Sequence, residues 1–199
     1  MNRIIKLRAE YIKDYYPEEQ THLITLGIQF YVSGRICYYR GLIHLFLVVP
    51  MLFRYAIEYL IKGYLSYDES MGKIKKYGHN LKKLWKRFKQ IEADQTLDRY
   101  DGFIDQFNKL EKIRYPKGER LLKLEEKDAF EIDLAFTFDK TNYYSGNEEI
   151  QWDINTIDAL IYEICKRMRS VVPVVEWIEF KYRALHEVFE DNKYFKKGR

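Results

Sequence analysis

Along residues 50–65, apolar side chains recur every three or four positions, which is the spacing of one face of an α-helix. Pro50 stands where a first-turn proline is tolerated, because its ring fixes φ near the helical value. Glu58 and Lys62 are four residues apart, in the order that favours an ion pair. The pattern predicts a mostly buried helix whose apolar positions are Leu52, Phe53, Ala56, Ile57, Tyr59, Leu60, Ile61 and Leu65.

A second amphipathic helix is predicted from Asn80 to about Ala93. Asparagine is a favoured N-cap residue, and the apolar residues that follow share one helical face. The intervening residues 66–77 are polar and include Gly72, so we interpret them as a linker. The apolar face consists of Leu81, Leu84, Trp85 and Phe88.

Helical spacing also recurs on both sides of this pair. We expect a helix over residues 2–15 and, after Pro17, one long helix that extends to Val49. A further helix is expected over residues 97–113, and it should stop before Pro116 because a residue that precedes proline is disfavoured in the α region. The last predicted helix begins near Thr156, with Asn155 as its cap, and continues to Pro173.

The long helix contains three glycines seven residues apart. Glycine costs about 1 kcal/mol relative to alanine inside a helix, so this stripe indicates close packing. Two interpretations remain open: a crossing against the helix over residues 50–65, or the interface of a homodimer. The glycines are Gly27, Gly34 and Gly41.

The hydrophobic period changes from helical to two in residues 129–138. Ile150, Trp152 and Ile154 alternate in the same way after a turn-like segment at residues 139–147. Alternation of this kind is typical of strands, so a β-hairpin inserted at about residues 128–154 is predicted. The 199 residues suit a single, mainly α domain that carries this insertion.

Composition changes this picture little. A hydrophobic content of 47% with 32% charged residues is typical of a globular protein. Cys37 and Cys165 lie in apolar helical patterns, so we expect buried free thiols in a reducing compartment. The N-terminal residues lack the apolar core of a signal peptide, and the most apolar run, 42–53, is too short to span a bilayer. A cytoplasmic protein with no membrane segment is the expectation.

Three short motifs resemble those of the HEPN family: Ala56-x-Glu58-x-x-x-Lys62, Gly78-His79-Asn80-Leu81 and Arg114-Tyr115-Pro116. The resemblance covers residues 20–116 and implies an antiparallel helical bundle that forms homodimers. It assigns structural roles to Glu58, Lys62, His79, Asn80 and Tyr115.

The ribonuclease members of that family carry an arginine followed four to six residues later by a histidine. In such a pair, the arginine steadies charge that develops on phosphorus and the histidine transfers the proton. Residues 118–120 after Arg114 are Gly, Glu and Arg, and residue 121 is Leu, so no histidine is present. We therefore expect no catalytic residues of the family type. Arg114 either caps carbonyls at a helix end or contacts a phosphate.

A basic run covers residues 73–89, with eight Lys/Arg and no carboxylate. Its residues Lys82, Lys83, Lys86 and Arg87 lie off the apolar face of the second helix and are candidate phosphate contacts. Residues 125–153 have the opposite character, with nine Asp/Glu against two Lys/Arg. The basic run is therefore either a solvated face, a partner for this acidic segment, or a nucleic-acid surface.

Three functions follow from these features. The first is a non-catalytic, homodimeric protein that binds RNA or nucleotide phosphates through its basic helix face. The second, implied by the resemblance, is a protein-interaction module, such as the partner of a nucleotidyltransferase or a component of a toxin–antitoxin or other defence system. The third is a ribonuclease with an unusual base, His79 or Glu119. The sequence contains neither a nucleotide-binding glycine loop nor a metal-spaced cluster, so no cofactor and no metal are expected.

Overall fold

A computed structural model describes residues 18–40, 48–111, 141–145, 148–169 and 194. This part of the chain is mainly helical, which confirms the predicted fold class at that level. The predicted helix over residues 2–15, Gly41, the strand over 129–138, and the motif residues Arg114 and Tyr115 lie outside the described residues.

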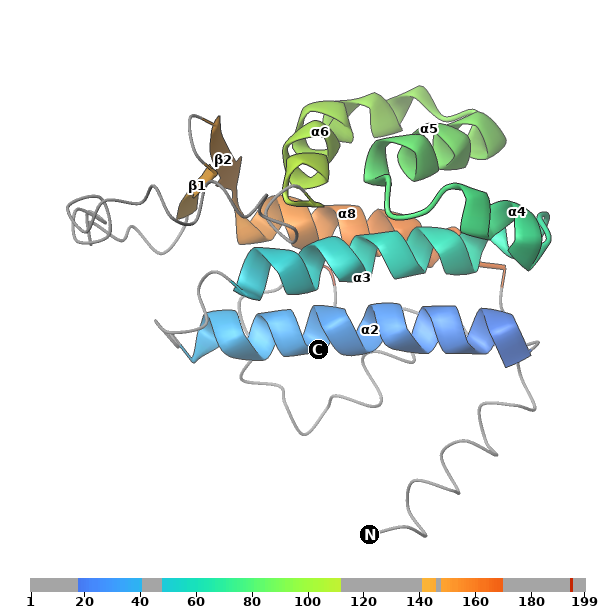
Figure 1. Ribbon diagram of the computed structural model, residues 1–199, viewed down its shortest axis with the longest axis horizontal. Helices are drawn as coiled ribbons and strands as arrows, with labels where there is room; N and C mark the ends of the chain where they lie inside the picture. The colour runs from blue at the N-terminus through green and yellow to red at the C-terminus, as the bar shows by residue number, and fades with distance from the viewer. Residues whose placement is uncertain (1–17, 41–47, 112–140, 146–147, 170–193, 195–199) are drawn as a thin grey trace, which may run out of the picture.

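Helices α2 (Glu18–Tyr39) and α3 (Val48–Leu65) lie side by side (Figure 1). A Cβ atom on Gly27 would stand 2.6 Å from Leu60 Cγ, and one on Gly34 would stand 2.7 Å from Phe53 Cε1. The approach is reciprocal, because a Cβ on Gly63 of α3 would meet Ile24 of α2 at 2.7 Å. The intramolecular interpretation of the glycine stripe is therefore confirmed for Gly27 and Gly34.

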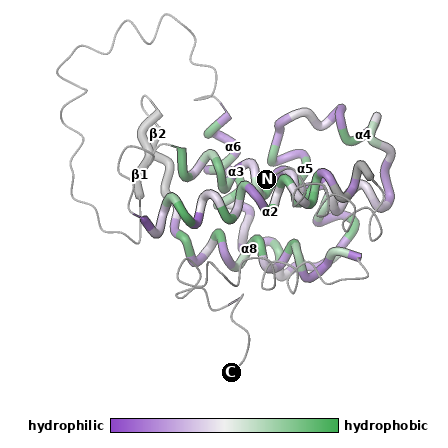
Figure 2. The backbone as a smooth tube through the Cα atoms, turned by 90° about the horizontal axis from the view of Figure 1, so that it is seen from below, coloured by the Kyte–Doolittle hydropathy of each residue, from purple (hydrophilic) through white to green (hydrophobic). Residues whose placement is uncertain are grey.

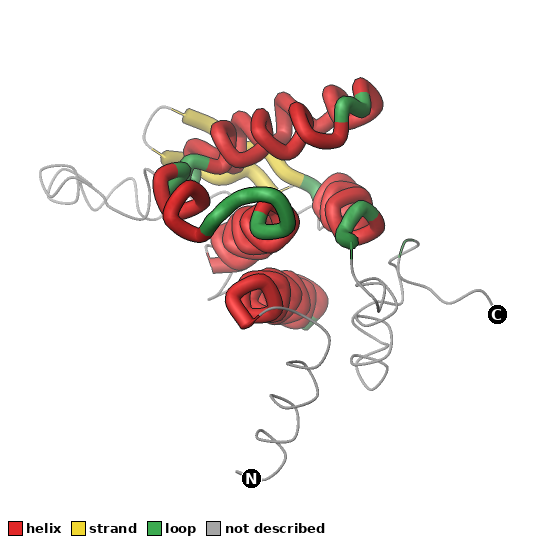
Figure 3. Tube along the Cα trace, turned by 90° about the vertical axis from the view of Figure 1, so that its right-hand side faces the viewer, coloured by secondary structure: helices red, strands yellow, loops and turns green. Residues whose placement is uncertain are grey.

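Helix α3 is the centre of the fold. Helix α8 (Ile154–Lys166) lies beside it, and Figure 3 shows α2, α3 and α8 end-on. The face of α3 that points away from α2 is covered by α5 (Leu81–Glu92) and α6 (Asp101–Lys109) (Figure 1). In Figure 2, apolar segments recur along α3, α6 and α8, the helices that contribute much of the buried core.

A buried ion pair joins α2 to α8. Asp158 accepts a hydrogen bond from Tyr31 Oη at 2.7 Å and one from Arg35 Nη1 at 3.0 Å. Arg35 and Asp158 have side-chain exposures of 1% and 3%, so the pair is shielded from water. It fixes the register between two helices that are distant in sequence.

The predicted start of helix α5 is confirmed. Asn80 is the N-cap, and its Oδ1 accepts a hydrogen bond from the backbone N–H of Lys83 at 2.9 Å. The linker interpretation of residues 66–77 is wrong in part, because it contains the short helix α4 (Met71–Lys76). Only Ile74 of this helix is buried, and Met71 packs against the core while partly exposed, so the helix has too few apolar positions to show a helical period in the sequence.

The helix predicted over residues 97–113 is divided. A 3₁₀ helix, η2 (Gln95–Tyr100), precedes α6, and Asp94 caps it by accepting a hydrogen bond from Thr96 N–H at 2.9 Å. The predicted apolar stripe nevertheless points inward: the buried residues include Tyr100, Ile104, Phe107 and Leu110.

Strands β1 (Thr141–Ser145) and β2 (Glu148–Trp152) pair antiparallel, with Thr141 opposite Trp152. Strand β1 lies where a turn was expected, so that part of the prediction is wrong. Ile154 is not a strand residue but the first residue of α8, because Asp153 caps this helix by accepting from Thr156 N–H at 2.9 Å. Asn155, the expected cap, lies inside α8.

Trp152 connects β2 to the helices. Its ring lies 6.0 Å from those of Tyr38 and Phe53, measured between centroids. Among the helices that the structure describes, none combines the length and apolar character needed to cross a membrane.

Candidate functional site

A cluster of charged residues lies where α3 meets the turn before α5, and Glu58 is at its centre. The Glu58 side chain is fully buried, and its Oε1 lies 2.7 Å from Lys62 Nζ and 2.8 Å from His79 Nδ1. Its other oxygen, Oε2, accepts a hydrogen bond from Arg54 Nη1 at 3.0 Å. The structure thus brings together three of the motif residues that the sequence assigned structural roles.

Arg54 is the member of this cluster that sequence reasoning missed. Its side chain is fully buried, and Nη2 donates to the backbone carbonyl of His79 at 2.5 Å and lies 2.7 Å from Glu111 Oε2. The available signal was its position four residues before Glu58 on an otherwise apolar helix. A buried guanidinium needs several acceptors, and here they come from three segments.

The turn between α4 and α5 positions His79. Gly78 has φ of +58°, a left-handed conformation that glycine adopts without strain. Gly78 N–H donates to Lys75 O at 3.0 Å, and Asn80 N–H donates to Tyr77 O at 3.2 Å. The chain therefore reverses tightly and directs the His79 side chain back towards Glu58.

The basic run forms the exposed side of α4 and α5, and its cations fall into two groups. The side-chain ammonium groups of four exposed lysines have no hydrogen bond or ion pair within the described part of the chain, and we call these residues the open lysines. The remaining cations contact carboxylates. The open lysines are Lys75, Lys76, Lys83 and Lys86.

The paired cations contact acids on three other segments. Lys82 lies 3.0 Å from Asp105 of α6, and Arg87 Nε lies 2.6 Å from Glu69. Lys89 contacts Asp98 at 2.6 Å and Asp101 at 2.7 Å. Of the four predicted phosphate contacts on α5, two are thus open and two have an acid partner in the same chain.

Glu69 joins α4 to α5, because it contacts Lys73 of α4 and Arg87 of α5. Burial alone would raise the pKa of this carboxyl, but hydrogen bonds from Lys73, Arg87 and Tyr77 hold it below its usual value. Its side chain is 1% exposed, so the carboxylate is committed to this structural role. Arg87 is therefore less available to a ligand than the open lysines.

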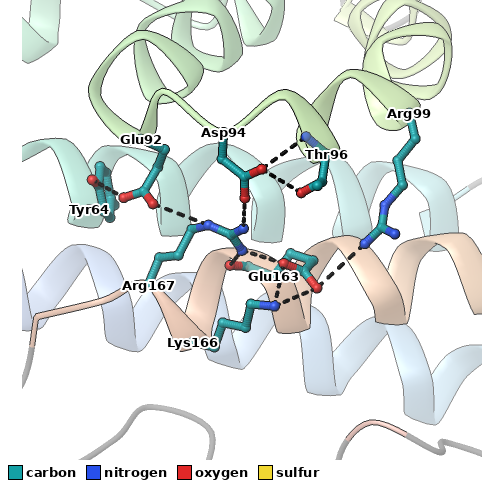
Figure 4. Close-up of polar contacts among 8 residues, drawn as sticks. All are labelled: Tyr64, Glu92, Asp94, Thr96, Arg99, Glu163, Lys166 and Arg167. Atoms are coloured by element: carbon teal, nitrogen blue, oxygen red, sulfur yellow. Dashed lines mark hydrogen bonds and ion pairs between the residues drawn. The ribbon is translucent and has the colours of Figure 1, made fainter.

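A second ionic network surrounds Arg167 at the end of α8 (Figure 4). Its guanidinium contacts Glu92 at the end of α5, Asp94 before η2, and Glu163 one turn earlier on α8. Lys166 lies 2.7 Å from Glu163, and Tyr64 of α3 donates to Glu92. Arg99 also belongs to this network, 3.5 Å from Glu163. The network then contains three cations and three carboxylates, and its net charge is zero. It therefore serves to fix helices rather than to attract a charged ligand.

Replacing Arg167 with methionine is expected to lower the free energy of unfolding at pH 7 by about 2 kcal/mol. This is less than a fully buried ion pair contributes, because the outer carboxylates reach solvent. The loss should shrink as the pH falls from about 4 towards 2. Hydrogen bonds from Thr96 and Arg167 lower the pKa of Asp94 to about 2, and Lys166 and Arg167 lower that of Glu163 despite its burial.

Such carboxyls stabilise the fold above their unfolded pKa of about 4 and lose that effect on acidification. Urea denaturation of the Arg167→Met variant and the unsubstituted protein measures the loss of unfolding free energy at pH 7 and its decrease at pH 3. Arg169→Met is the matched control, because the pair that Arg169 forms with Asp68 is exposed and should contribute less than about 0.5 kcal/mol. An equal loss in both variants would contradict the assigned role of Arg167.

Cys37 and Cys165 are both free thiols, as predicted, but only Cys165 is buried, and Cys37 is partly exposed. Burial raises the pKa of both, so neither has the thiolate character of a nucleophile. Within residues 18–40, 48–111, 141–145 and 148–169, no group of three or more His, Cys, Asp or Glu side chains could hold a metal ion.

Comparison with known proteins adds no assignment. The chain matches no family model, no curated protein and no solved structure.

Proposed function

We propose that this protein binds the phosphate groups of RNA or of nucleotides on the surface of α4 and α5, without catalysing a reaction on them. The observation that carries the proposal is the set of open lysines. Four exposed ammonium groups face solvent with no carboxylate contact in the described part of the chain. Such groups exchange condensed counterions for phosphates, which provides affinity without sequence preference.

Their placement suits a phosphate backbone. Lys83 and Lys86 are three residues apart on the exposed side of α5, and Lys75 and Lys76 lie at the end of α4. Lys82 should contribute less than the open lysines, because a phosphate must first displace Asp105 from their exposed pair. Arg114, beyond the described residues, is proposed as a further phosphate contact.

We further propose that the bundle is of HEPN type, carries an inserted β-hairpin at about residues 128–154, and forms a homodimer. The meeting of Glu58, Lys62 and His79 supports the first point, since these residues come from two separate motifs. The antiparallel pair β1–β2 supports the second. Light scattering of the purified chain tests the third.

Fluorescence anisotropy of a short single-stranded RNA at low and moderate salt tests the proposed function. Four lysine–phosphate contacts predict that affinity falls about 50-fold between about 50 and 200 mM salt. The same samples on a denaturing gel should show intact RNA. Absence of binding at the lower salt would overturn the proposal in favour of a protein-interaction module, and cleaved RNA would overturn its non-catalytic part.

A further inference from the structure

We propose that His79 is an additional phosphate contact on the α4–α5 surface, and that its contribution increases as the pH falls. This inference rests on the proposed function and deepens it. The sequence assigned His79 a structural role, and the structure shows a side chain that is anchored at one ring nitrogen and available at the other.

The anchored nitrogen is Nδ1, which lies 2.8 Å from Glu58 Oε1. A carboxylate can only accept, so Nδ1 carries the proton in both charge states of the ring. The nitrogen that remains for a ligand is Nε2. The His79 side chain is 45% exposed, and Nε2 has no hydrogen-bond partner among the described residues.

The backbone of His79 is fixed as well. Its carbonyl accepts a hydrogen bond from Arg54 Nη2 at 2.5 Å, and Gly78 and Asn80 on either side form the hydrogen-bonded turn. A ring held at its backbone and at Nδ1 loses little conformational freedom when a ligand binds at Nε2. This distinguishes it from the open lysines, whose long side chains must be ordered on binding.

The charges that face the ring determine the effect of protonation. Among the described residues, two positive and two negative charges lie around the ring: Arg54, Lys62 and Glu58 from α3, and Glu111, two residues after the end of α6. These four charges sum to zero when the imidazole is neutral. A proton on Nε2 adds one positive charge at the surface and creates an N–H donor for a phosphate oxygen.

Along the chain, this donor lies between open lysines. Lys76 precedes His79 by three residues at the end of α4, and Lys83 follows it by four residues in the first turn of α5. A chain of phosphates that follows the open lysines from α4 to α5 therefore passes the turn that contains His79. The predicted ligand is an extended polyanion such as single-stranded RNA.

The test compares the affinity for a single-stranded RNA at about pH 6 and pH 8, at constant salt. The protein is expected to bind roughly five- to tenfold more tightly at pH 6, as one additional charge-assisted contact predicts at a half-exposed site. His79→Gln should bind equally at both pH values and match the unsubstituted protein at pH 8. His22→Gln is the matched control, because His22 is exposed on α2, and it should retain the full pH effect.

A spectroscopic measurement covers the case in which His79→Gln does not fold. In ¹⁵N spectra of imidazoles in the unsubstituted protein, RNA should shift the Nε2 signal of His79 and leave Nδ1 bonded to Glu58. RNA binding that is equal at both pH values, or an unshifted Nε2, would overturn this inference and leave the proposed function intact. Absence of RNA binding at either pH would overturn both.

Discussion

Replacing Glu58 with glutamine is expected to lower the free energy of unfolding by about 3–5 kcal/mol, the loss typical when one partner of a buried ion pair is removed. Arg54 is fully buried and Lys62 is 11% exposed at the side chain, so neither cation can recover its hydration. Glutamine has nearly the same shape as glutamate but presents an amide donor to groups that already donate. The effect therefore arises from charge and hydrogen bonding rather than from a cavity.

Urea denaturation followed by circular dichroism measures this loss. Asp105→Asn is the matched control, because it neutralises a carboxylate whose pair with Lys82 is exposed, and it should change stability by less than about 0.5 kcal/mol. If Glu58→Gln lowered the free energy of unfolding as little as this control, Glu58 would not be the centre of a buried ionic cluster.

Replacing Gly27 with alanine is expected to destabilise the protein by about 1–3 kcal/mol or more, the range for an added group in a well-packed core. The new Cβ would lie 2.6 Å from Leu60 Cγ and 3.0 Å from the backbone nitrogen of Leu60. A side chain can rotate away from such a contact, whereas the backbone of α3 can yield only if the two helices separate. The intrinsic gain in helix propensity should be outweighed.

Gly102→Ala separates packing from propensity. Gly102 is also helical, but a Cβ there would have no neighbour within 4 Å, so this variant should gain about 0.5–1 kcal/mol. Thermal melts of the two alanine variants should therefore shift in opposite directions. Equal shifts would contradict the close contact between α2 and α3.

Local sequence patterns were sufficient to predict features that depend only on neighbouring residues of one element. The apolar stripe of α3, the cap at Asn80 and the pairing of Glu58 with Lys62 all follow from residues within four positions of one another, and the structure confirms them. The turn to His79 also has a local origin, since Gly78 supplies the left-handed residue.

The missed features depend on partners that are distant in sequence. Arg54 contacts His79 and Glu111, and Arg167 contacts Asp94, 73 positions earlier. A periodicity of three or four residues contains no information about such pairs. The same limit applies to the basic run, which has no carboxylate of its own but receives several from elsewhere, namely Glu69, Asp98, Asp101 and Asp105.

This division of the cations is the central claim about function: the open lysines, rather than the paired ones, hold phosphate. Two double variants remove the same charge from α5. One is Lys83→Gln with Lys86→Gln, and the other is Lys82→Gln with Lys89→Gln, whose ammonium groups already contact carboxylates.

The most direct measurement is the slope of log affinity against log salt for a single-stranded RNA, compared between these two variants and the unsubstituted protein. Each lost contact reduces the slope by about 0.7, so the open-lysine variant should lose about 1.4 and the paired variant clearly less. A slope unchanged by removal of the open lysines, or reduced equally in both variants, would contradict the account.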